Sequence, residues 1–215
     1  MRTCSSRSSG SPGGSAPSSA WNLATIYYWL GDRLSEETRA LIRDELDRRI
    51  FKPFEGSVQE DFPNCWWLKG RNKNNWNPVC LGCVSGAALA VIESRQRRAF
   101  FVASAEKYVQ AYLNGYQEDG FCTEGLGYWV YGFGHFVNLA ESITQATDGQ
   151  LDLLESPKTT TIARFGDRMK ILPGVYPAYA DCRTNQQPDK ALTAFLYGRY
   201  GWGKPELLAS GPAIR

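Results

Sequence analysis

The chain has 215 residues, a length that fits one domain with a sizeable core. Its hydrophobic content of 43% and charged content of 21% are ordinary for a soluble globular protein, and a net charge of +2 is too small to indicate nucleic-acid binding. No apolar run approaches the ~20 residues of a membrane-spanning helix, and the N-terminus has no apolar segment typical of a signal peptide. Aromatic residues are unusually frequent, with 7 Trp, 11 Tyr and 10 Phe, which suits a packed core and surfaces that stack on sugar rings.

The N-terminal part predicts a tail followed by helices. Residues 1–19 are rich in Ser, Gly and Pro, so we expect them to be disordered and residues 20–215 to form one domain. Trp21 to Leu30 is typical of a short buried helix. Ser35 is placed to cap a second, amphipathic helix, which we expect to end at Lys52-Pro53.

Three further helices are predicted in the middle of the chain. After a long connection, Asn77 followed by Pro78 is typical of a helix cap, and the apolar run behind it carries many small residues that allow close helix contacts. The next two helices are predicted over Arg98 to Leu113 and roughly over Tyr128 to Thr147.

The last part of the chain alternates helices with irregular structure. Ser156-Pro157 starts a weaker helix, Met169 to Ala180 suits an extended crossing or short strand, and Asp189 to Tyr200 predicts a clear helix. Pro205 to Ala209 indicates one more short helix. Six to eight helices joined in sequential pairs, with little or no β structure, indicate an all-α fold, arranged as an (α/α) toroid or an incomplete α/α barrel.

The cysteines do not identify the compartment. Cys80-x-x-Cys83 has the spacing of half a zinc site or a redox pair, but no second such pair exists and the single histidine lies elsewhere. Both cysteines fall among small apolar residues of a predicted helix. We therefore favour a packing role over metal or redox chemistry, and expect no metal site.

A glycine-rich stretch from Asp119 to Ala140 gathers side chains that can perform chemistry. Five glycines indicate close backbone approach, because glycine is costly inside an ordinary helix. The candidate side chains of this stretch are Glu124, Tyr128, Trp129, Tyr131 and His135. Two other groups precede it, and their members are Trp66, Trp67, Asn74, Asn75, Trp76 and Asn77.

Amides that bind hydroxyls or a carboxylate, beside aromatic rings that stack on sugars, together suit an acidic polysaccharide. The simplest reaction on such a substrate is β-elimination next to a uronic acid carboxylate. A donor such as Asn75 must then stabilise the developing enolate-like oxygen, and a tyrosine such as Tyr131 can act as base and acid. His135, four residues later, would share the helix face of Tyr131 and help to lower its pKa.

At these residues the sequence resembles the heparinase II/III-like polysaccharide lyases, which include alginate and oligoalginate lyases. The matching pieces are residues 74–90 (NNWNPVCLGCVSGAALA), 118–132 (EDGFCTEGLGYWVYG) and 165–181 (FGDRMKILPGVYPAYAD). The resemblance implies a catalytic α/α toroid that works without a cofactor, with Asn75 neutralising the carboxylate and Tyr131 as base and acid. It also suggests a periplasmic or secreted location.

The sequence departs from that family in two ways. Many relatives have a histidine where this chain has Trp76, and they usually continue into a large C-terminal β-sandwich. We therefore expect a partial toroid without the β-sandwich. Substrate binding is assigned to Trp66, Trp67, Trp76, Asn77 and Trp129, and catalysis to Asn75, Tyr131, His135, Glu124 and Tyr128.

Simpler roles stand beside these assignments. Asn77 suits a helix cap better than a ligand contact, Glu124 suits a first helical turn, and the aromatic residues and His135 suit a core. Two other functions also remain. One is a glycan-binding toroid without turnover, and the other is an α/α-barrel hydrolase that pairs Glu124 with Glu60, Asp61 or Asp181. The sequence leaves open which glycan binds and which oligomer forms.

Overall fold

The computed structural model describes residues 15–59, 65–68 and 73–205. Over these residues the fold is all-α, as predicted, and the only β feature is a single antiparallel bridge between Leu172 and Val175. The helices are α1 (Ser15–Leu30), η1 (Gly31–Arg33), α2 (Glu36–Leu46), η2 (Asp47–Phe51), α3 (Lys52–Gln59), η3 (Trp66–Leu68), α4 (Trp76–Val91), α5 (Arg95–Leu113), α6 (Gly125–Tyr128), η4 (Trp129–Phe133), α7 (Gly134–Ala146), α8 (Pro157–Ala163), α9 (Phe165–Arg168) and α10 (Lys190–Tyr200).

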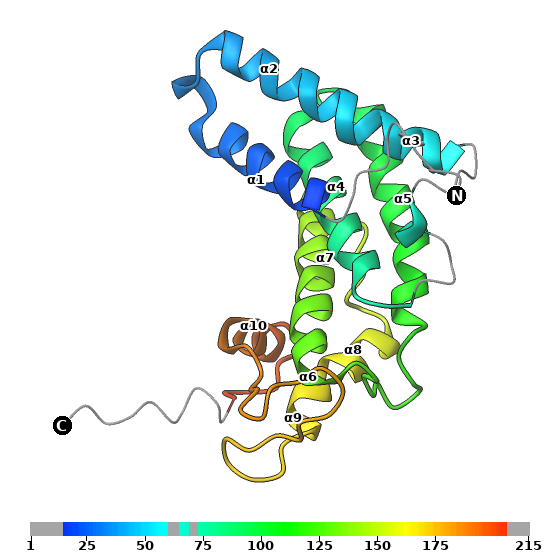
Figure 1. The fold of residues 1–215 in the computed structure, drawn as a ribbon, viewed down its shortest axis with the longest axis vertical. Helices are drawn as coiled ribbons and strands as arrows, with labels where there is room; N and C mark the ends of the chain where they lie inside the picture. The colour runs from blue at the N-terminus through cyan, green and yellow to red at the C-terminus, as the bar shows by residue number, and fades with distance from the viewer. Residues whose placement is uncertain (1–14, 60–64, 69–72, 206–215) are drawn as a thin grey trace, which may run out of the picture.

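Helices α1 to α5 form the upper part of the molecule, α6, α8, α9 and α10 form the lower part, and α7 runs between them (Figure 1). α4 is the central element, because α1, α5 and α7 all pack against it. Twelve of its sixteen residues are buried, which explains why its sequence is apolar on every side. Below it, α6, α8, α9 and α10 surround the start of α7 (Figure 1).

Helix α1 begins earlier and is more exposed than the sequence predicts. It starts at Ser15, so residues 15–19, expected in the disordered tail, are helical; residues 1–14 lie outside the described residues. Only one side of α1 is buried, where Ala20 and Ala24 face the core, and Trp29 is 79% exposed. The predicted buried helix is therefore wrong in its burial, because α1 lies at the edge of the molecule and packs mainly on α4 (Figure 1).

The second predicted helix is capped as expected but does not stop at Pro53. The Ser35 side chain accepts a hydrogen bond from the Thr38 amide, and the helical path then continues through η2 into α3. η2 is a π-helical segment in which the Lys52 amide donates to the Asp47 carbonyl, five residues back. This wider turn makes room where the proline ring would otherwise press on the preceding turn.

Several later predictions are confirmed. Helix α8 starts at Pro157, α10 spans Lys190–Tyr200, and α5 ends at Leu113, as expected. In addition, the Ser156 and Asp189 side chains cap α8 and α10. The predicted helix from Tyr128 to Thr147 is present as η4 and α7, with α6 immediately before it. The expected helix at Pro205 to Ala209 falls almost entirely outside the described residues. No helix among the described residues is long and apolar enough to cross a membrane.

Candidate functional site

The two sequence motifs meet where the N-terminus of α4 lies against η4. The Asn75 side-chain amide donates to a Glu124 carboxylate oxygen across 3.5 Å, a long hydrogen bond. Asn75 is 5% exposed, whereas Glu124 is half-buried immediately before α6. An amide nitrogen carries two hydrogens, so the bond to Glu124 uses one of the two Asn75 donors.

Gly132 explains how the two segments approach so closely. A Cβ placed on Gly132 would lie 2.8 Å from the Asn75 Cβ and 3.3 Å from the Asn75 Cα, too close for any side chain. Adding one Cα–Cα step along the chain places the Asn75 and Tyr131 Cα atoms within about 9 Å. The sequence prediction that these glycines mark close backbone approach is confirmed at this position.

Tyr131 is half-exposed and pairs with His135. Tyr131 is 47% exposed, and its ring meets the His135 imidazole edge-on, with centroids 4.7 Å apart. The His135 Nδ1 lies 2.7 Å from the Tyr131 carbonyl oxygen. Because a carbonyl can only accept, Nδ1 carries the proton and donates, which leaves Nε2 as the other reactive atom of the ring.

The expected lowering of the Tyr131 pKa is not found. Burial raises the pKa of Tyr131, and the nearby Cys83 and Cys80 add to the rise. His135 interacts with the carbonyl and the ring of Tyr131, which explains why its position on the same helix face does not favour the tyrosinate.

The pKa of Glu124 is higher than that of an ordinary surface carboxylate. Burial raises its pKa, hydrogen bonding to Asn75 opposes the rise, and the negative charge of Asp181 adds to it. Glu124 is therefore more readily protonated than a solvated glutamate, which suits a group that delivers a proton.

Two of the predicted sugar platforms belong to the core. Trp67 is 1% exposed and stacks on Phe54, and Trp129 is 1% exposed with its indole N–H donating to the Ile162 carbonyl at 3.0 Å. Their assignment to substrate binding is wrong for this structure, because no face of either ring is open. Tyr128, at the end of α6, is half-buried.

The other two tryptophans, Trp66 and Trp76, are solvent-exposed. Trp66 is 49% exposed and Trp76 is 37% exposed, and their rings lie 6.1 Å apart with a tilt of 59°. Trp76 is the first residue of α4 and directly follows Asn75, so this aromatic pair adjoins the site. Its exposed ring faces provide apolar surface of the kind on which a sugar can stack.

Asn77 is neither the predicted cap nor a substrate contact. It is fully buried, and its side-chain amide donates to the Trp67 carbonyl at 2.9 Å and to the Tyr108 carbonyl at 3.1 Å. Helix α4 starts at Trp76, two residues before the predicted start at Pro78, and the Asn74 side chain accepts from the Trp76 amide. The amide of Asn77 therefore ties η3 and α5 to the start of α4.

Sequence reasoning missed a buried polar row behind the site. The Tyr112 and Tyr116 hydroxyls are hydrogen-bonded to each other, and a Cβ on Gly132 would lie 2.8 Å from the Tyr112 hydroxyl oxygen. Burial raises the pKa of both tyrosines well above the usual value, so both stay neutral. Tyr112 lies near the end of α5 and Tyr116 lies in the turn that follows the helix, and nothing in the sequence joins this pair to Asn75.

A second missed feature is the segment after α9 that returns to the site. The Tyr179 hydroxyl donates to the Cys122 carbonyl at 2.6 Å, and the Gly127 amide donates to the Cys182 sulfur at 3.2 Å. A Cβ on Gly125 would lie 2.6 Å from that sulfur. These contacts explain how Asp181 comes close enough to raise the pKa of Glu124.

The predicted packing role of the Cys-x-x-Cys pair fits the structure. Cys80 and Cys83 are buried in α4, and burial raises their thiol pKa values to about 12 and about 11. Such thiols are unreactive near neutral pH. In the described part of the chain, no three His, Cys, Asp or Glu side chains come together as a metal site would need.

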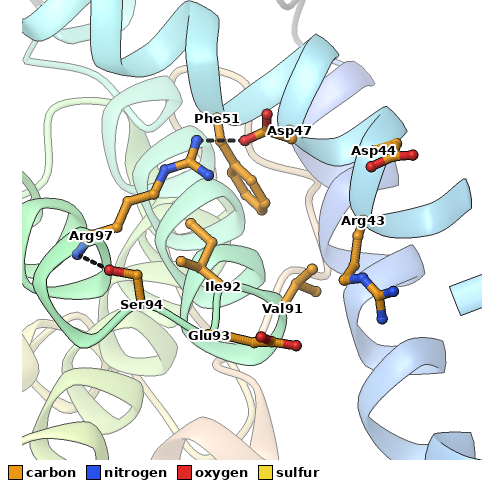
Figure 2. Close-up of a pocket in the computed structure, with 9 residues that line it drawn as sticks. All are labelled: Arg43, Asp44, Asp47, Phe51, Val91, Ile92, Glu93, Ser94 and Arg97. Atoms are coloured by element: carbon orange, nitrogen blue, oxygen red, sulfur yellow. Dashed lines mark hydrogen bonds and ion pairs between the residues drawn. The ribbon is translucent and has the colours of Figure 1, made fainter. Parts of the chain in front are cut away.

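Three hollows among the described residues lie away from Asn75. One of about 300 Å³ lies between α5 and the end of α7. Two others involve predicted site residues or ion pairs. One, of about 60 Å³, is lined by Trp21, Gly82, Cys83, His135, Asn138 and Leu139 and is too small for a sugar. The other, of about 420 Å³, lies between α2–η2 and the start of α5 (Figure 2).

The larger hollow contains an ion-pair network that stabilises the fold. Arg97 pairs with Asp47 at 2.5 Å and with Glu55 at 2.6 Å. Burial pushes the pKa of Asp47 upward, but Lys52 and Arg97 together hold it below the usual value. Because Arg97 already has two carboxylate partners, we assign this hollow no ligand.

No protein-family model matches the chain, and no curated protein matches it either.

Proposed function

We propose that this chain is a lyase domain, built as part of an α/α toroid, that cleaves uronic-acid-containing glycans by β-elimination. The observation that carries the proposal is the meeting of the two motifs: Asn75 bonds to Glu124 and packs on Gly132, next to the half-exposed Tyr131. A carboxylate-binding amide, a protonatable acid and a phenol within one sugar's reach are the groups that this elimination needs.

The side chains take the following roles in the proposed reaction. Asn75 uses its second amide hydrogen to bind the uronate carboxylate, which stabilises the enolate-like oxygen formed when the C5 proton leaves. The Tyr131 oxygen accepts that proton as tyrosinate, and the resulting phenol donates one to the departing glycosidic oxygen. Trp66 and Trp76 hold neighbouring sugar rings by stacking.

The raised pKa of Tyr131 gives the proposed reaction a defined pH dependence. A phenol with a pKa above its usual value near 10 is almost fully protonated at pH 7, so the reactive tyrosinate is scarce. The tyrosinate fraction increases about tenfold per pH unit below that pKa. We therefore expect elimination to accelerate from pH 7 to pH 9.

The decisive assay is the ultraviolet absorbance of the unsaturated uronate, measured with heparan sulfate and with alginate. The Tyr131→Phe variant should lose turnover by about a thousandfold while keeping glycan affinity. Tyr28→Phe, which alters a 71% exposed tyrosine on α1, is the matched control and should leave turnover unchanged. A folded protein with no absorbance change on either glycan, at any pH from 7 to 9, contradicts the proposal.

A second candidate function is hydrolysis, favoured by one specific observation. The negative charge of Asp181 adds to the rise in the pKa of Glu124, so the two carboxyl groups are near enough to interact. One protonated and one ionised carboxyl group are the requirement of a glycoside hydrolase. New reducing ends without ultraviolet absorbance, lost in Glu124→Gln and in Asp181→Asn, would indicate hydrolysis instead of elimination.

A third candidate, glycan binding without turnover, is favoured by the open tryptophan pair. Trp66→Ala should then weaken glycan binding measured by calorimetry, while neither absorbance nor reducing ends change in the unsubstituted protein.

A further inference from the structure

Helix α1 has an apolar face on the side away from the core. Leu23, Ile26 and Leu30 are three and four residues apart, and Trp29 lies three residues after Ile26, so the four side chains share one side of the helix. They are 39%, 44%, 42% and 79% exposed, respectively. Figure 1 shows α1 at the edge of the molecule, with no other described helix along its outer side.

The opposite side of the same helix is fixed in the core. Ala20 and Ala24 are 1% and 2% exposed, and a Cβ on Gly86 of α4 would lie 2.0 Å from the Trp21 ring. Helix α1 therefore cannot rotate to bury its outer face without losing its packing on α4. A helix that is apolar on both sides is typical of one covered on both sides.

The chemistry of α1 indicates what covers it. The sixteen residues from Ser15 to Leu30 include no charged side chain, so two copies of this face can meet without burying a charge or opposing like charges. Antiparallel pairing also aligns the opposite ends of the two helix dipoles. A membrane surface fits less well, because surface-lying helices carry basic side chains on their polar face, and the Asp32 carboxylate at the end of α1 is fully exposed.

The exposed area suits a weak dimer. A large aromatic side chain offers about 150–250 Å² and an aliphatic one somewhat less, so the exposed parts of the four side chains supply on the order of 400 Å² per copy. Polar side chains and main chain between them bring two copies toward the roughly 1,000 Å² of a small specific interface. Such an interface is expected to form at micromolar concentrations.

We propose that two copies of this chain pair through the apolar face formed by Leu23, Ile26, Trp29 and Leu30. The two α1 helices lie antiparallel about a two-fold axis that passes near Ile26, the middle of the face. In such a symmetric interface the residue at the axis meets its own copy. The pairing does not depend on the reaction proposed above.

Sedimentation velocity from about 1 to 200 µM tests the proposal, since weak specific dimers form in this range. The unaltered protein should shift from monomer to dimer, and Ile26→Glu should remain monomeric because it brings two carboxylates together at the axis. Ile171→Glu is the matched control, since Ile171 is 61% exposed in the segment after α9 and should leave the dimer intact. Far-UV circular dichroism and the melting temperature verify that each variant is folded.

A crosslinking experiment tests the orientation separately. Ile26→Cys should form a disulfide-linked dimer under mild oxidation, whereas Ile171→Cys should not. The proposal is overturned if the unaltered protein is monomeric at every concentration, or if Ile26→Glu dimerises as strongly as the unaltered protein. It is also overturned if Ile26→Cys fails to crosslink. The proposal would also be overturned in favour of membrane binding if the monomer sedimented with phosphatidylcholine–phosphatidylserine vesicles and Ile26→Glu reduced the bound fraction.

Discussion

Replacing Asn77 by alanine distinguishes two roles for its side chain: a buried hydrogen-bond donor to two segments, as the structure shows, or the helix cap that the sequence predicts. Asn77 is fully buried and donates to two carbonyl groups, those of Trp67 at 2.9 Å and Tyr108 at 3.1 Å. Alanine removes both hydrogen bonds and leaves the Trp67 carbonyl without this donor. An ordinary N-cap would lose one hydrogen bond at the surface, where water replaces it.

The magnitude follows from these contacts. Two lost hydrogen bonds cost about 1 kcal/mol each, and an unpaired buried carbonyl costs about 1–3 kcal/mol more. The Asn77 side-chain oxygen has no hydrogen-bond partner in the described part of the structure, and its removal offsets about 1 kcal/mol. The free energy of unfolding should therefore fall by roughly 2–4 kcal/mol, a large fraction of the stability of a typical domain.

Urea unfolding followed by circular dichroism measures this loss. Ser35→Ala removes a genuine cap, since the Ser35 side chain accepts from the Thr38 amide at an exposed helix start, and should cost about 1 kcal/mol or less. The decisive quantity is the ratio of the two losses. If Asn77→Ala lowers the free energy of unfolding no more than Ser35→Ala does, the buried hydrogen-bonding role is refuted and a simple cap role fits better.

Three further predictions concern packing and charge, each measured by urea unfolding. Gly86→Ala should destabilise the protein by about 1–3 kcal/mol because its Cβ would lie 2.0 Å from an indole ring of α1, whereas Gly198→Ala, with open space around it, should be neutral or stabilising by about 0.5 kcal/mol. Glu124→Gln should stabilise the protein at pH 7. The folded protein loses stability as the pH rises and Glu124, whose pKa is raised, must ionise, so the difference in stability between variant and unaltered protein should vanish below about pH 4. Arg97→Ala should cost about 1–2 kcal/mol at pH 7 and less as pH falls below about 4, because the lowered pKa of Asp47 gives stability that acid removes; equal losses at pH 7 and pH 3 would contradict this.

Local signals in the sequence predict the helices well. Ser35, Ser156 and Asp189 cap helices as their residue types indicate, because an N-cap depends on atoms within one turn. Pro53 misleads for the same reason. Its ring forbids an ordinary α-helical turn, but a π-helical segment before it accommodates the ring, and the wider geometry has no short sequence pattern.

Burial was harder to predict because it depends on partners distant in sequence. Trp66 and Trp67 are neighbours with the same chemistry, yet one is 49% exposed and the other 1% exposed. In a short 3₁₀ helix adjacent side chains point in different directions, and only the position of Phe54 in α3 decides which ring has a stacking partner. The sequence can thus place an aromatic pair near a site without saying which member faces solvent.

The site itself combines both kinds of information. The glycines of residues 119–140 predict close approach, and Gly132 provides it, but the partner that arrives there is Asn75, about sixty positions earlier. The electrostatics depend on a third segment, since Asp181 raises the pKa of Glu124 only because the chain returns past Gly125 and Gly127. A charge that acts through space has no signature in sequence spacing. The residue types near Asn75 are therefore those of acid–base chemistry. Whether the Tyr131 phenol or the Glu124–Asp181 carboxyl pair would perform it depends on how the fold places these groups.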